Sequence, residues 1–392
     1  MPWRETSPMD QKTQFIADYL RQSLSMSELC ELYRISRKTG YKLVGRYLKH
    51  GPSGLEDRSR RPSSSPNHTP EDIVEAIVAL RQRHPSWGAK KLLPILGKRH
   101  PDWELPGRST VCDILSRQGL VPKKRNRRHI GHPGKPSMQI LAPNDCWSAD
   151  FKGQFKTGDG HYCYPLTVTD GFSRYLFACQ GLGSTSVAGS KPVFTRLFKE
   201  FGLPRRIRTD NGVPFATNTL ARLSSLSAWW VRLGVLPELI EPGKPQQNGR
   251  HERMHRTLKA ETTRPPANTC RGQQRKFDRF LHEFNFERPH EALDMQTPAS
   301  LYEPSLRPMP DKIPPLEYPD RFEVRYVSAN GGIRWNKDWV NVSITCVGEY
   351  VGLEEIDDGI WNVYFGALKL GRLHERHMRI EDAYGRLKRH NV

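Results

Sequence analysis

The sequence predicts a multidomain protein with N-terminal all-α helix-turn-helix units, a central α/β core built on a mixed sheet, and a small C-terminal β-barrel. Three observations carry this prediction. Helical hydrophobic spacing dominates residues 8–118, whereas residues 141–305 combine strand-like runs with helical segments. After a proline-rich stretch that ends at Pro319, the chain continues in short alternating runs such as RFEVRYV and WVNVSIT, which are typical of small barrels.

The composition is that of a globular protein. The 392 residues are enough for two to four domains of about 100–200 residues each. The apolar content is 36%, and no uninterrupted apolar stretch reaches the roughly 18 residues of a membrane span, so we expect no membrane partner. The first residues lack the apolar core of a signal peptide. The seven cysteines are scattered without a CxxC pair, which argues against a disulfide framework or zinc site and favours a reducing compartment.

Positive charge is concentrated at the N-terminal end. Residues 1–137 hold 26 Lys or Arg and 13 Asp or Glu, so they carry +13 of the net +19. A clustered basic charge favours a polyanionic partner such as nucleic acid. The alternative is that the positive charge serves only to keep the protein soluble, which explains less well why the charge is clustered.

The first domain, residues 1–55, is expected to hold three short helices. Two of them cover Met9–Gln22 and Ser27–Tyr33, and Ser36 then caps the basic helix SRKTGYKLVGRYLKH. A short helix, a tight turn and a basic helix are the pattern of a helix-turn-helix. An ordinary three-helix bundle with a solvated charged face fits the same pattern. The expected DNA contacts are Arg37, Lys38, Thr39 and Lys42.

A second helix-turn-helix domain is expected at residues 71–122, after a linker at 56–70. Its helices would cover Glu71–Arg83, Trp87–His100 and Ser109–Gln118, with Ser109 as the last cap. A basic linker, residues 123–140, follows and contains KKRNRRH. We expect this run to face DNA, although a solvated linker is the alternative. The residues concerned are Lys123, Lys124, Arg125, Arg127 and Arg128.

The core, residues 141–305, is expected to alternate strands and helices, and a linker at 306–320 separates it from the barrel and basic tail at 321–392. The predicted strands are Asp145–Phe155, Tyr162–Asp170, Tyr175–Leu182 and Arg205–Thr209. The predicted helices are Val187–Phe201, Asn218–Leu233, His251–Thr263 and Arg271–Phe286.

Three acidic residues in this core form a candidate metal site: Asp150 in a strand, Asp210 at a strand end before Asn-Gly, and Glu252 at a helix start. Three carboxylates suit Mg²⁺. Two such ions about 3.5–4 Å apart serve phosphodiester transfer, and we expect Asp150 to bridge them. Alone, an Asp before Asn-Gly is a turn residue and a Glu near a helix start is a dipole partner. Asp170 competes for the role, but a turn with a local Asp–Arg contact explains it.

The helix that begins near Glu252 also predicts DNA contacts. His255, Arg256 and Lys259 follow at helical spacing and share its face, whereas Met254 and Leu258 are expected to pack inward. The preceding loop, PGKPQQNG, is expected to close over DNA, and a mobile surface loop is the alternative. Its expected contacts are Lys244, Gln246, Gln247 and Asn248.

These motifs carry a resemblance. WSADFKG, TDNGVPF, PGKPQQNGRHERMHRTLK and the closing FNFERPHEALDMQTPASLY resemble, in order and context, the integrase-type DDE core of bacterial insertion-sequence transposases, relatives of retroviral integrases. The resemblance implies an RNase H-like fold, the catalytic triad Asp150, Asp210 and Glu252, and DNA strand transfer with Mg²⁺ or Mn²⁺. The 42-residue step from Asp210 to Glu252 exceeds that of retroviral integrases, and their N-terminal zinc module is absent.

The resulting prediction is a bacterial, cytoplasmic and nucleoid-associated DNA transposase. It would bind the terminal inverted repeats of an insertion sequence, cleave the element ends and join them to target DNA. Because two DNA ends must be held together, we expect a homo-oligomer on DNA. Two alternatives remain: a DNA-binding regulator with an inert core, and an RNase H-like nuclease that does not join strands.

Overall fold

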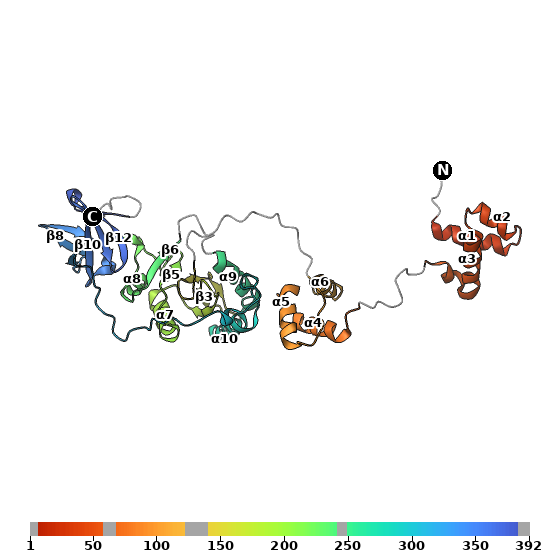
Figure 1. Cartoon of the computed structure of the whole chain (residues 1–392), viewed down its shortest axis with the longest axis horizontal. Coiled ribbons are helices and arrows are strands. Elements are labelled where there is room, and N and C mark those ends of the chain that lie inside the picture. Colours follow the sequence, from red (N-terminus) through yellow and green to blue (C-terminus); the bar gives the residue numbers. More distant parts are fainter. Residues whose placement is uncertain (1–6, 58–67, 122–139, 241–248, 383–392) are drawn as a thin grey trace. The chain divides into compact units, whose positions relative to one another are not determined.

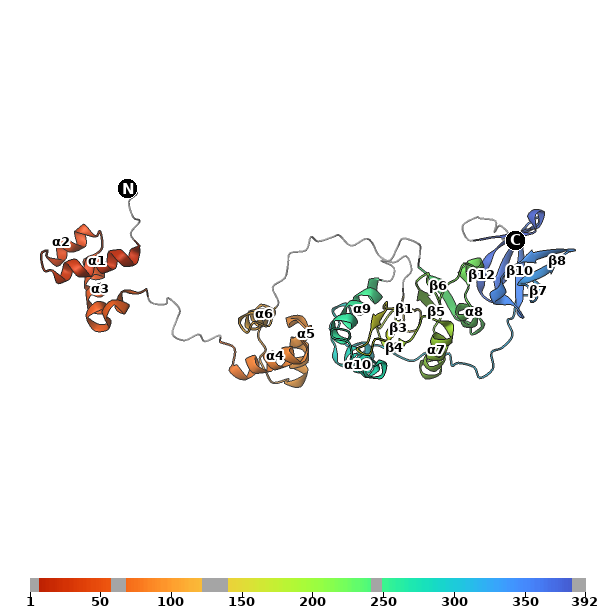
Figure 2. The ribbon, with the colours of Figure 1, turned by 180° about the vertical axis from the view of Figure 1, so that it is seen from behind.

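The computed structural model describes residues 7–57, 68–121, 140–240 and 249–382. The chain divides into two compact units, Met1–Pro70 and Glu71–Val392. Figure 1 and Figure 2 show the elements of both units from opposite sides. In the described ranges, no helix has the length and apolar character that crossing a bilayer requires.

Residues 7–57 of the first unit form the helices α1 (Pro8–Leu20), α2 (Met26–Leu32) and α3 (Arg37–His50), and the short 3-10 helix η1 (Gly51–Leu55). The predicted cap is confirmed, because Ser36 Oγ accepts a hydrogen bond from the Thr39 amide at 3.2 Å. The core includes Phe15, Ile16, Leu29, Leu43 and Val44.

Helices α2 and α3 pack closely because Gly40 is small. A Cβ atom added to this residue would lie 2.5 Å from Cys30 Sγ, which is far inside van der Waals contact. The closeness keeps the turn between the two helices tight, as a helix-turn-helix requires.

The second unit begins with α4 (Glu71–Arg83), α5 (Ala89–Arg99) and α6 (Arg108–Arg117), which enclose a small core of their own. The three predicted helices are present. The predicted cap of the last one is wrong, since α6 begins at Arg108 and its N-cap is Gly107, without a side-chain cap bond. Gly107 has the extended backbone of a cap, which places Ser109 inside the first turn.

A mixed six-stranded sheet forms the centre of this unit, as predicted. Its order is β2-β3-β1-β5-β6, with β4 also paired to β3. Strand β1 is antiparallel to β3 and parallel to β5, and β5 is parallel to β6. The strands are β1 (Trp147–Phe151), β2 (Phe155–Lys156), β3 (Tyr162–Asp170), β4 (Leu176–Leu182), β5 (Arg206–Thr209) and β6 (Leu236–Leu239).

Helices cover both faces of the sheet (Figure 1). On one face, α7 (Val187–Phe201) and α8 (Ser225–Arg232) contribute to a core that contains Trp147 and Ala149 of β1. On the other face, α9 (Gly249–Thr262) and α10 (Cys270–His282) contribute to a core with residues of β3 and β4. Because side chains alternate along a strand, Asp150 lies on the face that α9 covers.

Two predicted helices of the core differ from those observed. The single helix expected over residues 218–233 is divided into a 3-10 turn, Leu220–Arg222, and α8, because Ser224 begins a new helix with a capping box to Ser227. The helix expected to reach residue 286 ends at His282 and continues as a π-helical turn, Glu283–Glu287.

The C-terminal region is β-structure, as predicted. A five-stranded antiparallel sheet has the order β13-β12-β11-β10-β7, and β8 and β9 form a hairpin. Among residues 321–382, these pairings do not close into a barrel. The strands are β7 (Glu323–Tyr326), β8 (Gly332–Trp335), β9 (Asp338–Asn341), β10 (Tyr350–Asp357), β11 (Ile360–Phe365), β12 (Leu368–His374) and β13 (Arg379–Glu381).

A pair of leucines tests the core on the α7 face. Leu197 is 0% exposed and Leu306 is 99% exposed. We expect Leu197→Ala to lower the free energy of unfolding by about 2–5 kcal/mol, because it removes buried methyl groups and leaves a cavity. Leu306→Ala is the control and should change it by less than about 0.5 kcal/mol. Denaturant unfolding measures both, and equal effects would contradict the packing described.

Candidate active site

The pairing of β1 with β5 brings two of the predicted carboxylates to one edge of the sheet. In this parallel pair Ala149 lies opposite Thr209, so the next residues along the two strands are Asp150 and Asp210. Parallel neighbours emerge at the same edge. Two residues that are 60 positions apart in the sequence therefore leave the sheet side by side.

The charge on Asp150 depends on both of the other predicted carboxylates. Burial, together with the negative charges of Asp210 and Glu252, raises the pKa of the Asp150 carboxyl to about 7. The backbone amide of Phe151 and the charge of Lys152 act in the opposite direction. Because like charges at this site repel, a divalent cation bound among these oxygen atoms would relieve the repulsion. Hard oxygen donors of this kind fit Mg²⁺ or Mn²⁺.

A tight turn fixes Asp210. Its Oδ1 accepts a hydrogen bond from the Gly212 amide at 3.2 Å, and the Asn211 side chain donates to the carbonyl of Ile240 at 3.0 Å. A Cβ atom on Gly212 would lie 3.1 Å from Asp210 Oδ2, so a larger residue would crowd the carboxylate and displace it by a few tenths of an ångström. The Asn-Gly sequence thus forms the predicted turn and orients the carboxylate as well.

Helix α9 places Glu252 through the two histidines near it. His251 and His255 lie one turn apart on the helix face that packs against the sheet, and they are 2% and 5% exposed. The Nε2 atoms of His251 and His255 lie 2.7 and 2.6 Å from Thr167 Oγ1, respectively. Thr167 is the cross-strand partner of Asp150. Glu252, in the first turn of α9, is exposed beside this contact.

The hydrogen atoms at this contact can be assigned by counting. The Thr167 hydroxyl has one proton, which it donates to the carbonyl oxygen of Asp150 at 3.0 Å. It must therefore accept from both histidine Nε2 atoms. The Nδ1 of His251 lies 3.1 Å from Thr169 Oγ1, and the Nδ1 of His255 lies 3.8 Å from Asp150 Oδ2. Burial lowers the pKa of His251 to about 3 and that of His255 to about 2, so both rings are neutral at neutral pH.

The placement of His255 differs from its predicted role as a DNA contact. It belongs with His251, Met254 and Leu258 to a buried stripe, in which Met254 and Leu258 pack inward as predicted. The exposed stripe of α9 contains Glu252, Arg256 and Lys259. The helical spacing of residues 251, 254, 255 and 258 is the sequence signal for the buried stripe. Histidines at two of these four positions make the stripe look polar, so the signal is easily missed.

Asp170 takes part in a turn, as predicted, but not through an Asp–Arg contact. Its Oδ2 accepts from the Phe172 amide and from the amide and hydroxyl of Ser173, and its Oδ1 accepts from the Asn144 amide. Arg174 donates to the Gly171 carbonyl instead. The carboxylate is 1% exposed and fully engaged, so it is not available to a metal.

Of the other predicted DNA contacts, one group lies on the surface and two groups lie outside the described residues. At the start of α3, Arg37, Lys38, Thr39 and Lys42 are exposed, as a DNA-facing role requires. The two groups outside the described residues are Lys123, Lys124, Arg125, Arg127 and Arg128 of the basic linker, and Lys244, Gln246, Gln247 and Asn248 of the loop.

Comparison with known protein families agrees with this architecture. Two models described as an integrase core domain match residues 141–245 and 233–298. Models described as a helix-turn-helix domain and a homeodomain-like domain match residues 11–63 and 39–115. The chain carries an integrase core and helix-turn-helix domains.

Individual proteins resemble the chain over the same regions. A protein of the insertion element IS407 from Burkholderia multivorans (strain ATCC 17616 / 249) is 24% identical over 70% of this chain and 93% of its own. A Gag-Pol polyprotein of baboon endogenous virus (strain M7) is 28% identical over 48% of this chain, and the match spans 11% of that polyprotein. With the family matches, these relatives place the chain in the enzyme class of DDE transposases and integrases.

A solved structure also matches the core. It is the HTLV-2 integrase catalytic core domain in complex with magnesium, in its trimeric form. The match covers 42% of this chain and 100% of that one, at 14% sequence identity and a TM-score of 0.32.

A basic cavity of about 560 Å³ lies beside the carboxylates of the integrase core. Its floor includes Ser148 and Thr169, which are cross-strand partners on the same sheet face as Asp150, about 7 Å back along the strands. Among the described residues that line it, six are Lys or Arg and two are Asp or Glu. They are Lys91, Arg174, Arg208, Arg253, Arg256 and Arg288, against Asp170 and Glu291.

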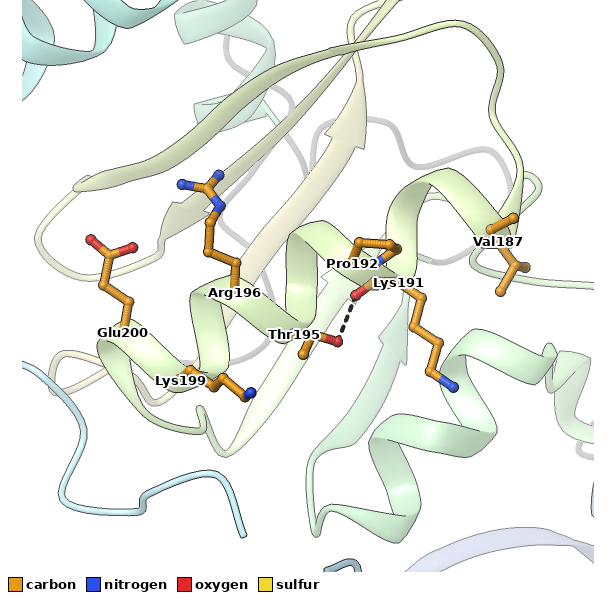
Figure 3. Close-up of a pocket in the computed structure, with 8 residues that line it drawn as sticks. Val187, Lys191, Pro192, Thr195, Arg196, Lys199 and Glu200 are labelled. Atoms are coloured by element: carbon orange, nitrogen blue, oxygen red, sulfur yellow. Dashed lines mark hydrogen bonds between the residues drawn. The ribbon is translucent and has the colours of Figure 1, made fainter. Parts of the chain in front are cut away.

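A separate hollow of about 870 Å³ lies along the outer face of α7 (Figure 3). Val187, Lys191 and Thr195 line it, and the Thr195 hydroxyl donates to the Lys191 carbonyl at 2.9 Å. None of the predicted site residues lines this hollow. It is larger than the basic cavity, but its lining has no carboxylate pair and no histidine, so it lacks the residues of the candidate site near Asp150.

The contact between α9 and the sheet can be tested at Thr167. We expect Thr167→Val to lower the free energy of unfolding by about 1–3 kcal/mol or more, because both histidine N–H groups would have no buried acceptor. Thr195→Val on α7 is the matched control, since its hydroxyl only serves a helix carbonyl near the surface. Denaturant unfolding measures the difference. Equal effects of the two substitutions would contradict the assigned hydrogen bonds.

Proposed function

We propose that the protein is a DNA transposase that binds the terminal inverted repeats of an insertion sequence, cleaves the element ends and joins them to target DNA. One observation carries the proposal: Asp150 lies partly buried at a sheet edge, where the charges of Asp210 and Glu252 both act on it. The integrase core and the insertion-element relative support the same reaction class.

Asp150, Asp210 and Glu252 are the residues that would hold Mg²⁺ or Mn²⁺. When bound, two such ions activate the attacking oxygen and stabilise the leaving oxygen of a phosphodiester. We assign Asp150 to both ions because it is influenced by both partners, and Asp210 and Glu252 to one each. Asp150 is held by strand pairing and Asp210 by its turn, so the protein orients these carboxylates before any substrate arrives.

The basic cavity supplies a path for the DNA backbone. Arg253 and Arg256 are exposed, and neither has a carboxylate partner within the described part of the chain. Arg256 and Lys259 follow Glu252 at i+4 and i+7 on α9 and share its face, and Arg253 is the next residue after Glu252. Their positive charge would hold phosphates next to the carboxylates and offset the repulsion between a DNA strand and the acidic cluster.

The remaining parts of the proposal concern recognition and assembly. The exposed basic start of α3 would read the element ends, and a homo-oligomer would hold two ends together. The proposed organisation keeps the domain boundaries predicted from the sequence, with the C-terminal β-structure as the last domain. The protein would act on the bacterial nucleoid in the cytoplasm.

The catalytic carboxylates can be tested on a labelled duplex that carries an element end. We expect Mg²⁺-dependent nicking by the native protein and a loss of at least about 100-fold in Asp150→Asn or Glu252→Gln, because even an outer partner of a metal ligand contributes about 10–100-fold. DNA binding in EDTA should persist. Glu200→Gln on α7 is the control, since Glu200 is an exposed carboxylate that is not one of the proposed metal ligands. Binding without nicking by the native protein would favour a regulator, and nicking without joining would favour a nuclease.

Recognition by α3 can be tested through salt dependence. The triple variant Arg37→Gln, Lys38→Gln and Lys42→Gln should bind DNA more weakly, and the slope of log K against log salt should fall by about 0.9 for each phosphate that is no longer neutralised. Arg21→Gln is the control, because Arg21 already pairs with Asp18 at the end of α1. Fluorescence anisotropy across a salt series measures the slopes. An unchanged slope in the triple variant would exclude phosphate contacts by these residues.

A further inference from the structure

One atom of the α9 contact is left without a hydrogen bond within the described part of the chain. This is Nδ1 of His255, which lies 3.8 Å from Asp150 Oδ2. The three residues Asp150, His251 and His255 offer ligand atoms that all lie within 4.8 Å of one another. A separation of 3.8 Å is too long for a hydrogen bond between the two atoms.

Hydrogen-bond counting shows which histidine is able to bind a cation. The single proton of Thr167 goes to the Asp150 carbonyl, so both Nε2 atoms donate to Thr167. His251 then uses its Nδ1 as the acceptor for Thr169. Both nitrogens of His251 are therefore engaged. The Nδ1 of a neutral His255 instead carries a lone pair that faces a carboxylate oxygen.

We propose that His255 Nδ1 is a nitrogen ligand of the ion that Asp150 holds, so that the metal site combines imidazole with carboxylates. The inference rests on the proposed function, since it adds a ligand to the site proposed there. It also explains why a histidine occupies the buried stripe of α9 at the position that faces Asp150.

The geometry agrees with a shared ion. Two ligand atoms at about 2.1 Å from one cation lie about 3 Å apart at a right angle and about 4.2 Å apart on opposite sides, and 3.8 Å falls between these limits. A histidine that binds a metal through one nitrogen normally donates from the other to a fixed acceptor, which orients the ring. Thr167 is such an acceptor for His255.

A nitrogen ligand has a consequence for metal preference. Imidazole suits transition metals, whereas Mg²⁺ prefers oxygen, so an Asp150–His255 pair should favour Mn²⁺ over Mg²⁺ more than carboxylates alone do. His255→Gln should weaken Mn²⁺ binding by about 10-fold or more, and should weaken Mg²⁺ binding less. The ratio of the two affinities therefore reports the nitrogen ligand without any measurement of activity.

The direct test is the electron spin-echo spectrum of Mn²⁺ bound to the full chain without DNA. We expect nitrogen modulation from a coordinated imidazole in the native protein, its loss in His255→Gln, and its retention in His161→Gln, which removes a histidine with a 75% exposed side chain. Asp150→Asn should abolish binding at this site. Thermal unfolding of each variant establishes that it is folded.

The outcomes separate this inference from the proposed function. Mn²⁺ that binds in an Asp150-dependent manner with oxygen ligands only would overturn the role of His255 and leave the carboxylate site intact. Nitrogen modulation that persists in His255→Gln would overturn it as well. No Asp150-dependent binding would remove the proposed metal site itself. The native spectrum alone decides the first case, even if His255→Gln does not fold.

Discussion

The hydroxyl group of Thr167 joins the helix that carries Glu252 to the strand that carries Asp150. It donates to the backbone of Asp150 and accepts from two histidines of α9. Side-chain networks in a low-dielectric interior hold their geometry firmly when every member is satisfied. The position of Glu252 relative to Asp150 therefore depends on a polar contact inside the protein.

Charge is divided between two adjacent regions of this edge. Carboxylates gather where β1 and β5 end, and arginines gather in the cavity beside them. On their own, the carboxylates would strongly repel a phosphate, and the arginines would strongly attract one. In the proposed function, the arginines would attract a DNA strand along this edge, and cations would be needed only where the strand meets the carboxylates. This arrangement explains why a strongly basic protein places acidic side chains at its centre.

Much of this architecture follows from local sequence. Regular hydrophobic spacing sets α4 and α7 at their predicted bounds, and β3 coincides with its predicted run. Strand β6 was not predicted because LPEL is short and contains proline, which periodicity does not distinguish from a loop. The predicted cap of α6 is wrong because the N-cap is Gly107, which has an extended backbone and no side chain, and not the serine expected from the sequence. The single helix near residue 225 was divided by a cap that composition alone does not reveal.

The sequence predicts the three carboxylates as site residues, since each has a distinctive neighbourhood, but it does not predict their mutual arrangement. That arrangement depends on tertiary contacts such as the register of β1 with β5. The burial of His255 was missed for a related reason. Histidine is usually read as a surface residue, and only the sheet behind α9 supplies the threonine that makes an interior position favourable.

The parallel register of β1 and β5 also sets how sensitive the core is to changes of length. A shift of β5 by one residue would turn the whole strand over, so that Arg206–Thr209 would exchange their inward and outward sides and Asp210 would leave the edge it shares with Asp150. The four-residue strand has little hydrophobic surface with which to resist such a slip. Its neighbours β1 and β6 must therefore hold it from both sides, which makes the inner position of β5 in the sheet a condition for chemistry rather than a detail of topology.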